Sequence, residues 1–180
     1  MKRHHFLIVI AAALFGIAGA FVYREIGDGN GSAITGANED ADVAAVMAAV
    51  LPDLDQKPQP LKQWQGKVMV VNFWAPWCPP CREEIPGFIA LQKKYGDKGL
   101  VFVGIALDEA SRVQAYADEI GINYPVLIGG PEGGQLSSAA GNRLGGLPYT
   151  LIIDRQGKAV ANFTGAVPEK KLEDQIAPLL

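Results

Sequence analysis

Long apolar runs alternate with helix-prone segments along most of the chain. The near-continuous runs 68–74 and 100–107 predict two buried strands. A helix should follow the first run and end near Tyr95, with Gly96 as its stop, and a second should span 111–120. Strands that lack polar alternation are typical of parallel sheets covered by helices on both faces. The pattern therefore predicts an α/β fold with a mostly parallel core.

Shorter segments predict the remaining elements. Further strands are expected at 124–128, 151–154 and 158–164, with a hairpin turn between the last two. Helices are expected at 136–144 and from Pro168 onward, because proline suits the first position of a helix.

The segment before the first long strand is expected to hold a linker and a hairpin. Residues 27–32 are a flexible tether, and 42–50 carries apolar residues at helical spacing, so 25–50 is predicted to be a linker with a short helix. The prolines of 52–61 suit an edge hairpin. One domain, 51–180, remains, and its roughly 130 residues suffice for a core.

The first 24 residues combine a basic start with an uncharged apolar run. Lys2 and Arg3 precede 6–23, a run of about 18 residues that would span most of a bilayer core. Basic residues on the short N-terminal side favour export of the domain on the other side of the run. Residues 1–24 are therefore predicted to be a signal-anchor, although Ala18-Gly19-Ala20 leaves a cleaved signal peptide open.

Composition and charge exclude several classes of function. The chain has 180 residues, is 49% hydrophobic and carries a net charge of -3, which is too slight and too evenly spread to indicate a nucleic-acid partner. The glycine-rich segment 129–134 is expected to be a flexible loop, and it lacks the context of a phosphate-binding loop. No cofactor is expected.

The only two cysteines form the motif Cys78-Pro79-Pro80-Cys81, where the strand 68–74 should give way to a helix. The positive end of that helix stabilises a thiolate, the form that attacks disulfides. Regular helix is expected from Pro80, and the Cys81 N–H is the nearest donor to the Cys78 sulfur, so the Cys78 pKa should lie below the free value of about 8.5 without being extremely low. The implied chemistry is reversible dithiol–disulfide exchange.

The segment 72–86, NFWAPWCPPCREEIP, resembles the active-site segment of thioredoxin-fold proteins. More narrowly, it resembles the TlpA/ResA-like membrane-anchored thiol–disulfide oxidoreductases, including those of cytochrome c maturation. The likeness covers roughly residues 50–180. It implies a thioredoxin-like fold, a central mixed sheet flanked by helices, with an N-terminal β-hairpin extension and a central insertion at 108–128. It also implies a single-pass protein of the bacterial inner membrane, with its catalytic domain on the periplasmic side.

The same resemblance indicates residues that bind the substrate. Leu147-Pro148 resembles the cis-proline loop of the thioredoxin fold, in which the backbone of the preceding residue pairs with an extended substrate segment. Trp77, Pro79 and Pro80 are expected to contact the substrate beside the cysteines.

A proton carrier is less obvious. Ordinary thioredoxins have a buried Asp where this chain has Asn72, which cannot titrate. In ResA-like proteins a Glu at the end of the next strand lies near the cysteines, and Glu109 matches it, with Asp108 as a competitor. A carboxylate shielded from water has a raised pKa and can relay a proton to the Cys81 sulfur. The alternative is that Glu109 is an exposed cap of the following helix.

The helix after Cys81 carries two acidic residues and a proline near its start. Glu83 and Glu84 are expected to be solvated charges that complement the positive helix end. Pro86 removes the bond to the Arg82 carbonyl, so a kink is expected.

The expected reaction begins with attack of the Cys78 thiolate on a partner disulfide, and the more buried Cys81 then releases the reduced partner. Since Pro79 and Pro80 add no charge between the cysteines, the reductase direction is favoured. The resemblance suggests apocytochrome c CxxCH pairs or respiratory copper-site thiols as substrates, and an upstream membrane dithiol donor.

Metal binding is the main alternative. A zinc site needs about four ligands, and the only histidines, His4 and His5, lie in the N-terminal tail. A Cu(I)-binding metallochaperone using the thiolates of Cys78 and Cys81 stays open, because thiolates suit this soft ion, although copper-delivery relatives generally add a His ligand.

Overall fold

The computed structural model describes residues 42–180. The expected leader, 1–24, and the linker up to residue 41 lie outside the described residues. Within the described part, no helix has the length and apolar character needed to cross a membrane.

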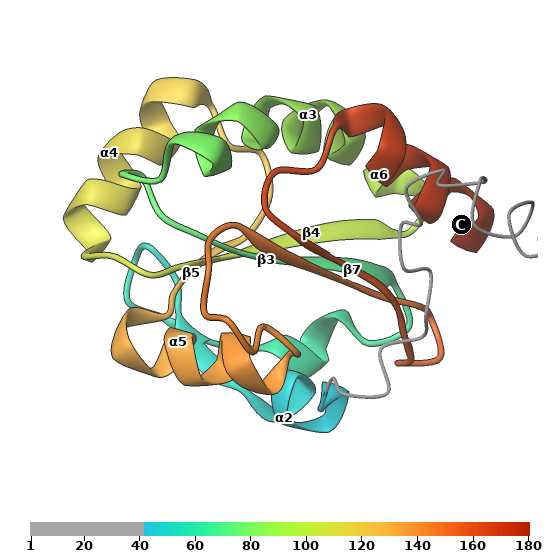
Figure 1. Cartoon of the computed structure of the whole chain (residues 1–180), viewed down its shortest axis with the longest axis horizontal. Coiled ribbons are helices and arrows are strands. Elements are labelled where there is room, and N and C mark those ends of the chain that lie inside the picture. Colours follow the sequence, from blue (N-terminus) through green and yellow to red (C-terminus); the bar gives the residue numbers. More distant parts are fainter. Residues whose placement is uncertain (1–41) are drawn as a thin grey trace, which may run out of the picture. The chain divides into compact units, whose positions relative to one another are not determined.

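A five-stranded mixed sheet forms the centre of the domain, in the order β5-β4-β3-β6-β7 (Figure 1). Its strands are β3 (Val68–Trp74), β4 (Leu100–Ala106), β5 (Val126–Ile128), β6 (Tyr149–Ile153) and β7 (Ala159–Thr164). β3, β4 and β5 run parallel, whereas β6 and β7 are antiparallel to their neighbours. The mixed sheet implied by the family resemblance is confirmed. The mostly parallel core predicted from the apolar pattern is found only in β3, β4 and β5.

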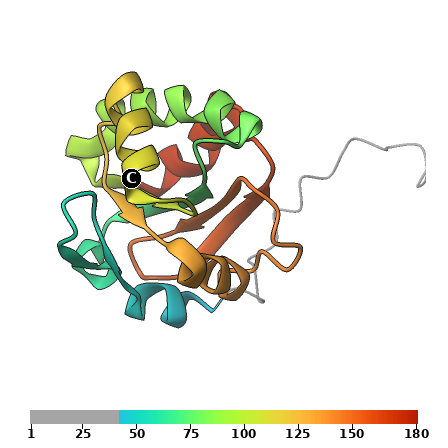
Figure 2. The ribbon, with the colours of Figure 1, turned by 90° about the vertical axis from the view of Figure 1, so that its left-hand side faces the viewer.

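Helices cover both faces of the sheet, as Figures 1 and 2 show. The helices are α2 (Val43–Ala48), α3 (Pro79–Tyr95), α4 (Ala110–Ile120), α5 (Gly130–Ala139) and α6 (Glu169–Ile176). Helices α3, α4 and α6 lie on one face, and α2 and α5 on the other (Figure 1). Along β3, Val70 and Trp74 pack on the face covered by α3, α4 and α6, while Val71 and Phe73 pack on the face covered by α2 and α5. Because both faces of the strand are buried, its sequence shows no polar alternation.

Short elements complete the chain. β1 (Val50–Pro52) and β2 (Pro58–Pro60) pair antiparallel as a separate hairpin, which confirms the expected N-terminal extension. Asp53 closes its turn by accepting hydrogen bonds from the N–H groups of Asp55 and Lys57, both at 2.9 Å. Three 3₁₀ turns follow β2, α3 and α6: η1 (Leu61–Trp64), η2 (Gly96–Lys98) and η3 (Ala177–Leu179).

Predicted helix boundaries are wrong at α3, α5 and α6. Helix α6 begins at Glu169, because Pro168 takes the extended N-cap conformation and not the first helical position. Helix α3 begins at Pro79, not Pro80, because Cys78 takes the extended N-cap conformation and the fixed φ of Pro79 suits the first helical position. Helix α5 begins at Gly130, inside the segment expected to be a flexible loop, and ends before most of the helix expected at 136–144. The N-cap residue Gly129 allows close packing at its start, since a Cβ on Gly129 would lie 2.8 Å from the Ile105 side chain.

Candidate functional site

The two cysteines form a disulfide at the junction of β3 and α3. Cys78 is the N-cap of α3, and its sulfur accepts a hydrogen bond from the Cys81 N–H at 3.4 Å. This is the donor expected from the sequence. Cys78 is 3% exposed and Cys81 is completely buried. A thiolate at Cys78 would therefore be stabilised by the Cys81 N–H at the start of the helix, while Cys81 has no surface exposed to solvent.

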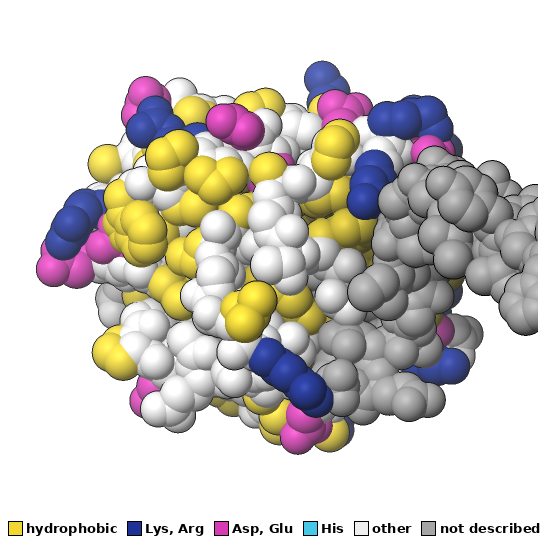
Figure 3. Space-filling model, in the orientation of Figure 1, with side chains coloured by type: hydrophobic (Ala, Val, Ile, Leu, Met, Phe, Trp, Pro, Cys, Tyr) yellow, Lys and Arg dark blue, Asp and Glu magenta, His cyan; other side chains and the backbone are white. Residues whose placement is uncertain are grey.

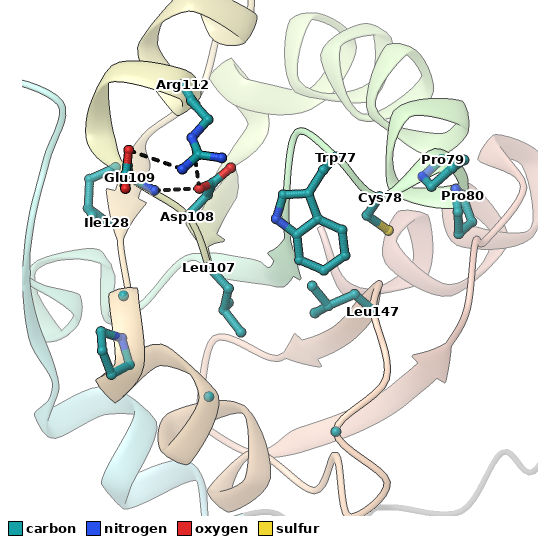
Figure 4. Close-up of a pocket in the computed structure, with 14 residues that line it drawn as sticks. Trp77, Cys78, Pro79, Pro80, Leu107, Asp108, Glu109, Arg112, Ile128 and Leu147 are labelled. Carbon is teal, nitrogen blue, oxygen red and sulfur yellow. Dashed lines mark hydrogen bonds and ion pairs between the residues drawn. The ribbon is translucent and has the colours of Figure 1, made fainter.

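A pocket of about 950 Å³ opens beside Cys78. Trp77, Leu107 and Leu147 point toward its interior from three different segments (Figure 4). Trp77 is 63% exposed, which is unusual for so large an apolar side chain in this domain. The space-filling view shows hydrophobic side chains gathered between α4 and α5 on this face (Figure 3). Pro79 and Pro80 also line the pocket.

The Leu147–Pro148 peptide bond is cis, as the resemblance implied. Leu147 lines the pocket, and the Pro148 carbonyl accepts a hydrogen bond from the Gly165 N–H at 2.9 Å. This hydrogen bond joins the cis-proline loop to the segment between β7 and α6. Proline has no N–H of its own to present to the sulfurs.

Glu109 lies at the pocket rim but is not shielded from water. Its side chain is 72% exposed, and its Oε2 lies 3.1 Å from Nη2 of Arg112 (Figure 4). The expected shielding is wrong, because β4 ends at Ala106 and Glu109 is already the N-cap of α4, beyond the buried layer. The exposed position is the alternative that the sequence left open, although the Glu109 side chain makes no capping bond.

Asp108 is the more buried of the two neighbouring acids. Its side chain is 8% exposed, and Oδ1 accepts a hydrogen bond from the Glu109 N–H at 2.8 Å and lies 3.5 Å from Nε of Arg112. Its Oδ2 is buried without a hydrogen-bond partner in the described structure. Both acids therefore belong to the pocket rim and are bound to the same guanidinium.

Glu84 is the buried carboxyl of the site, and the expectation of a solvated charge is wrong. It is 4% exposed, because it lies on the face of α3 that packs on the sheet. Oε1 accepts from Nδ2 of Asn72 at 2.8 Å, and Oε2 accepts from the Val167 N–H at 3.0 Å. Burial raises the Glu84 pKa to about 7, against the opposing effect of these two hydrogen bonds.

Glu84 stands one turn along α3 from Cys81, on the same side of the helix. The helical spacing of Cys81, Ile85 and Phe88, which are all buried, marks this side as the inner face. Glu84 lies within the same stripe, and that was the sequence signal for its burial. The site thus holds two sulfurs and one carboxyl that titrates near neutral pH. Among residues 42–180, no group of three or more His, Cys, Asp or Glu side chains is arranged to hold a metal ion.

Comparisons with known proteins agree with this geometry. The Redoxin family model matches residues 36–176. The thiol-disulfide oxidoreductase ResA of Bacillus thuringiensis is 34% identical over 125 residues, which cover 69% of this chain and 70% of that protein. The thioredoxin-like protein YneN of Bacillus subtilis is 33% identical over 129 residues, 70% of this chain and 73% of its own length. A thiol:disulfide interchange protein of Chlorobium tepidum superposes with a TM-score of 0.65 at 32% identity, covering 73% of this chain and 92% of its own.

Proposed function

The chain belongs to the redoxin family, as a thiol–disulfide oxidoreductase of the ResA type, and from this premise we propose that it reduces disulfides in exported partner proteins. The observation that carries the proposal is the difference between the two sulfurs. Cys78 stands at the positive end of α3 on the pocket, and Cys81 lies behind it without access to solvent. Such an arrangement suits one attacking thiolate and one resolving thiol.

The proposed reaction transfers two electrons from the domain to the partner. The Cys78 thiolate attacks one sulfur of the partner disulfide, and the other partner sulfur leaves as a thiolate. Cys81 then loses its proton and attacks Cys78, which restores the Cys78–Cys81 disulfide and releases the second partner thiolate. An upstream dithiol donor must return two electrons before the next cycle.

We assign the proton transfer to Glu84 in place of Glu109. The Cys81 thiol must lose a proton inside the core, and Glu84 is the buried carboxyl on the next turn of the same helix. A pKa of about 7 lets the group accept a proton and release it again near neutral pH. Glu109 is exposed and paired with Arg112, so it lies outside the core in which the Cys81 thiol must lose its proton.

The direction and the partners of the reaction belong to the proposal. Pro79 and Pro80 contribute no charge that would stabilise the reduced thiolate, which favours a reductant. The resemblance supports apocytochrome c CxxCH pairs or respiratory copper-site thiols as partners. The basic start and apolar run of residues 1–24 support a single-pass anchor that places the domain outside the cytoplasm.

Trapping tests the proposal directly. In the Cys81→Ser variant the mixed disulfide through Cys78 cannot be resolved, so partner proteins should accumulate as adducts that dithiothreitol releases. The matched Cys78→Ser variant keeps Cys81, which is buried, and should trap nothing. Equal trapping by both variants, or by neither, would contradict the assignment of roles. For the direction, the reduced protein should convert an oxidised CxxCH peptide to its dithiol, and failure to do so would reject the reductase direction.

A further inference from the structure

Asn72 lies at the centre of the buried polar cluster that contains the Glu84 carboxyl. It is on β3 and is 1% exposed. Its Nδ2 donates to Glu84 Oε1 at 2.8 Å and to Thr150 Oγ1 at 3.0 Å. We propose that Asn72 is a positioning residue. It holds the Glu84 carboxyl one helical turn from Cys81 and can form a hydrogen bond with that carboxyl in both of its protonation states. The inference rests on the proposed exchange reaction and deepens it.

The amide of Asn72 can serve either state because it has donors on one side and an acceptor on the other. In the present orientation it donates to the carboxylate, while its Oδ1 is buried without a hydrogen-bond partner in the described structure. A half-turn of the amide would present Oδ1 to the O–H of a protonated Glu84, and the Thr150 hydroxyl can donate as well as accept. Two hydrogen bonds are therefore available before and after proton transfer. An aspartate in this place would repel the ionised Glu84.

The cluster also fixes the carboxyl relative to the cis-proline loop. Through Asn72, Glu84 is joined to Thr150, which follows Pro148 by two residues. Through its other oxygen, Glu84 is joined to Val167. The N–H of Gly165, two residues before Val167, bonds to the Pro148 carbonyl at 2.9 Å. Two sets of hydrogen bonds thus connect Glu84 with the cis-proline loop, and Asn72 is part of one of them.

Among the described residues, few other charges face this carboxyl. Cys81 precedes it by one turn on α3. Tyr124 lies in the segment before β5, and its pKa is raised mainly by burial and to a smaller extent by the Glu84 charge. On α6, Glu169 lies over Gly87 of the next turn and is exposed. The strands contribute an amide and a hydroxyl. Since burial and two hydrogen bonds account for the Glu84 pKa, the loss of one bond should be measurable.

The test is the titration of the Glu84 carboxyl by ¹³C NMR in the oxidised full-length chain, where neither thiol titrates. The Glu84→Gln variant identifies the signal by its loss. Asn72→Leu keeps a similar volume but removes the donor, so the Glu84 pKa should rise by about one to two units. Asn72→Asp places a second carboxyl against the first, so two coupled midpoints are expected, the upper one above the wild-type value.

Asn142→Leu is the matched control. Asn142 is also buried, and its Nδ2 donates to Ser137 at 2.9 Å and to the Gly146 carbonyl at 2.8 Å, not to Glu84. Its loss should leave the Glu84 midpoint in place. The proposal is overturned if the midpoints of Asn72→Leu and Asn72→Asp both stay within about 0.3 unit of the wild type. Should the Leu variant not fold, the nearly isosteric Asp variant decides the matter.

This titration needs no partner protein and no exchange reaction. A normal response of the Glu84 pKa to the Asn72 variants, together with absent trapping by Cys81→Ser, would reject the proposed reductase function alone. Normal trapping together with an unmoved Glu84 midpoint would reject the role of Asn72 alone.

Discussion

Two carboxyls near the cysteines show how much a residue depends on its surroundings. Glu84 is 4% exposed and accepts two hydrogen bonds from groups far away in the chain. Glu109 is largely exposed and pairs with Arg112, three residues away in the sequence. Both are glutamates near the start of a helix that follows a buried strand, Glu84 in the second turn of α3 and Glu109 at the N-cap of α4. Burial raises the pKa of Glu84 to about 7.

The raised pKa of Glu84 predicts a pH dependence of stability. Burial moves the pKa from 4.5 to about 7, so the folded state holds this proton more tightly than the unfolded state. The contribution of Glu84 to stability is fully present below pH 4.5 and is lost as the pH rises through about 7. Because Glu84→Gln cannot ionise, its free energy of unfolding should gain about 3 kcal/mol relative to the wild type over this window. Urea unfolding at a series of pH values measures the difference.

Glu109→Gln is the control for that experiment. Its carboxylate is exposed and forms a surface ion pair with Arg112, so its removal should change the free energy of unfolding by less than about 1 kcal/mol. The alkylation rate of Cys78 in the reduced protein should likewise change its pH profile in Glu84→Gln and keep it in Glu109→Gln. Matching behaviour of the two variants would argue against Glu84 as the proton acceptor.

Trp77 predicts a difference between large and small substrates. The exposed indole beside Cys78 offers a partner protein an apolar contact that a small disulfide does not need. Trp77→Ala should therefore slow reduction of a protein disulfide by about tenfold. The rate with oxidised glutathione, measured in parallel, should stay nearly unchanged. An equal loss with both substrates would mean that Trp77 acts on Cys78 itself.

At the scale of elements, α5 shows why a glycine-rich segment can still form a helix. Four of its ten residues are glycine or proline, and isolated helices of that composition are weak. The helix nevertheless packs on the end of β4, where Ile105 and, just after the strand, Leu107 lie against Gly133. Tertiary burial of one face outweighs the poor local propensity, which explains the wrong boundary predicted from sequence.

Two glycines in different elements should respond to alanine in opposite ways. Gly134 in α5 has no atom within 4 Å of an added Cβ, so Gly134→Ala should raise the free energy of unfolding by about 0.5–1 kcal/mol. Gly104 in β4 would place its Cβ 2.9 Å from Nε1 of Trp74, so Gly104→Ala should lower it by about 1–3 kcal/mol. Urea unfolding of both variants is the measurement. Stabilisation by Gly104→Ala would show that the Trp74 side chain moves at little cost.

At the scale of the whole molecule, the sheet brings distant segments to one end. The carboxyl ends of β3 and β4 lead into the cysteine motif and the Asp108–Glu109 rim, and the cis-proline loop precedes β6. Since β6 runs antiparallel to β3, its first residue Tyr149 pairs with Phe73, near the end of β3. The mixed sheet is therefore what brings Leu147 to the same pocket as Trp77 (Figure 4).

Export of the domain is testable on the full chain. Alkaline phosphatase needs disulfides and is active only outside the reducing cytoplasm. A C-terminal fusion to the full chain should be active, and the same fusion without residues 1–24 should be inactive. Equal activity of the two fusions would contradict the proposed location.

The sequence by itself determined the features that depend on neighbouring residues. The spacing of Cys78 and Cys81, their place between a strand and a helix, and the periodicity of the main elements are all local properties. They sufficed to predict the layered fold and the exchange chemistry. The family likeness added the cis bond before Pro148, which composition could not show.

Only the tertiary structure decided which groups hydrogen-bond to the buried acid. The hydrogen bonds that define the cluster join residues 83 positions apart, from Val167 to Glu84, and 78 apart, from Asn72 to Thr150. No local pattern specifies such pairs, because they form only when β3, β6 and α3 pack together. Helical spacing places Glu84 on the inner face of α3, but the extent of its burial, and with it the raised pKa of Glu84, is a property of that packing.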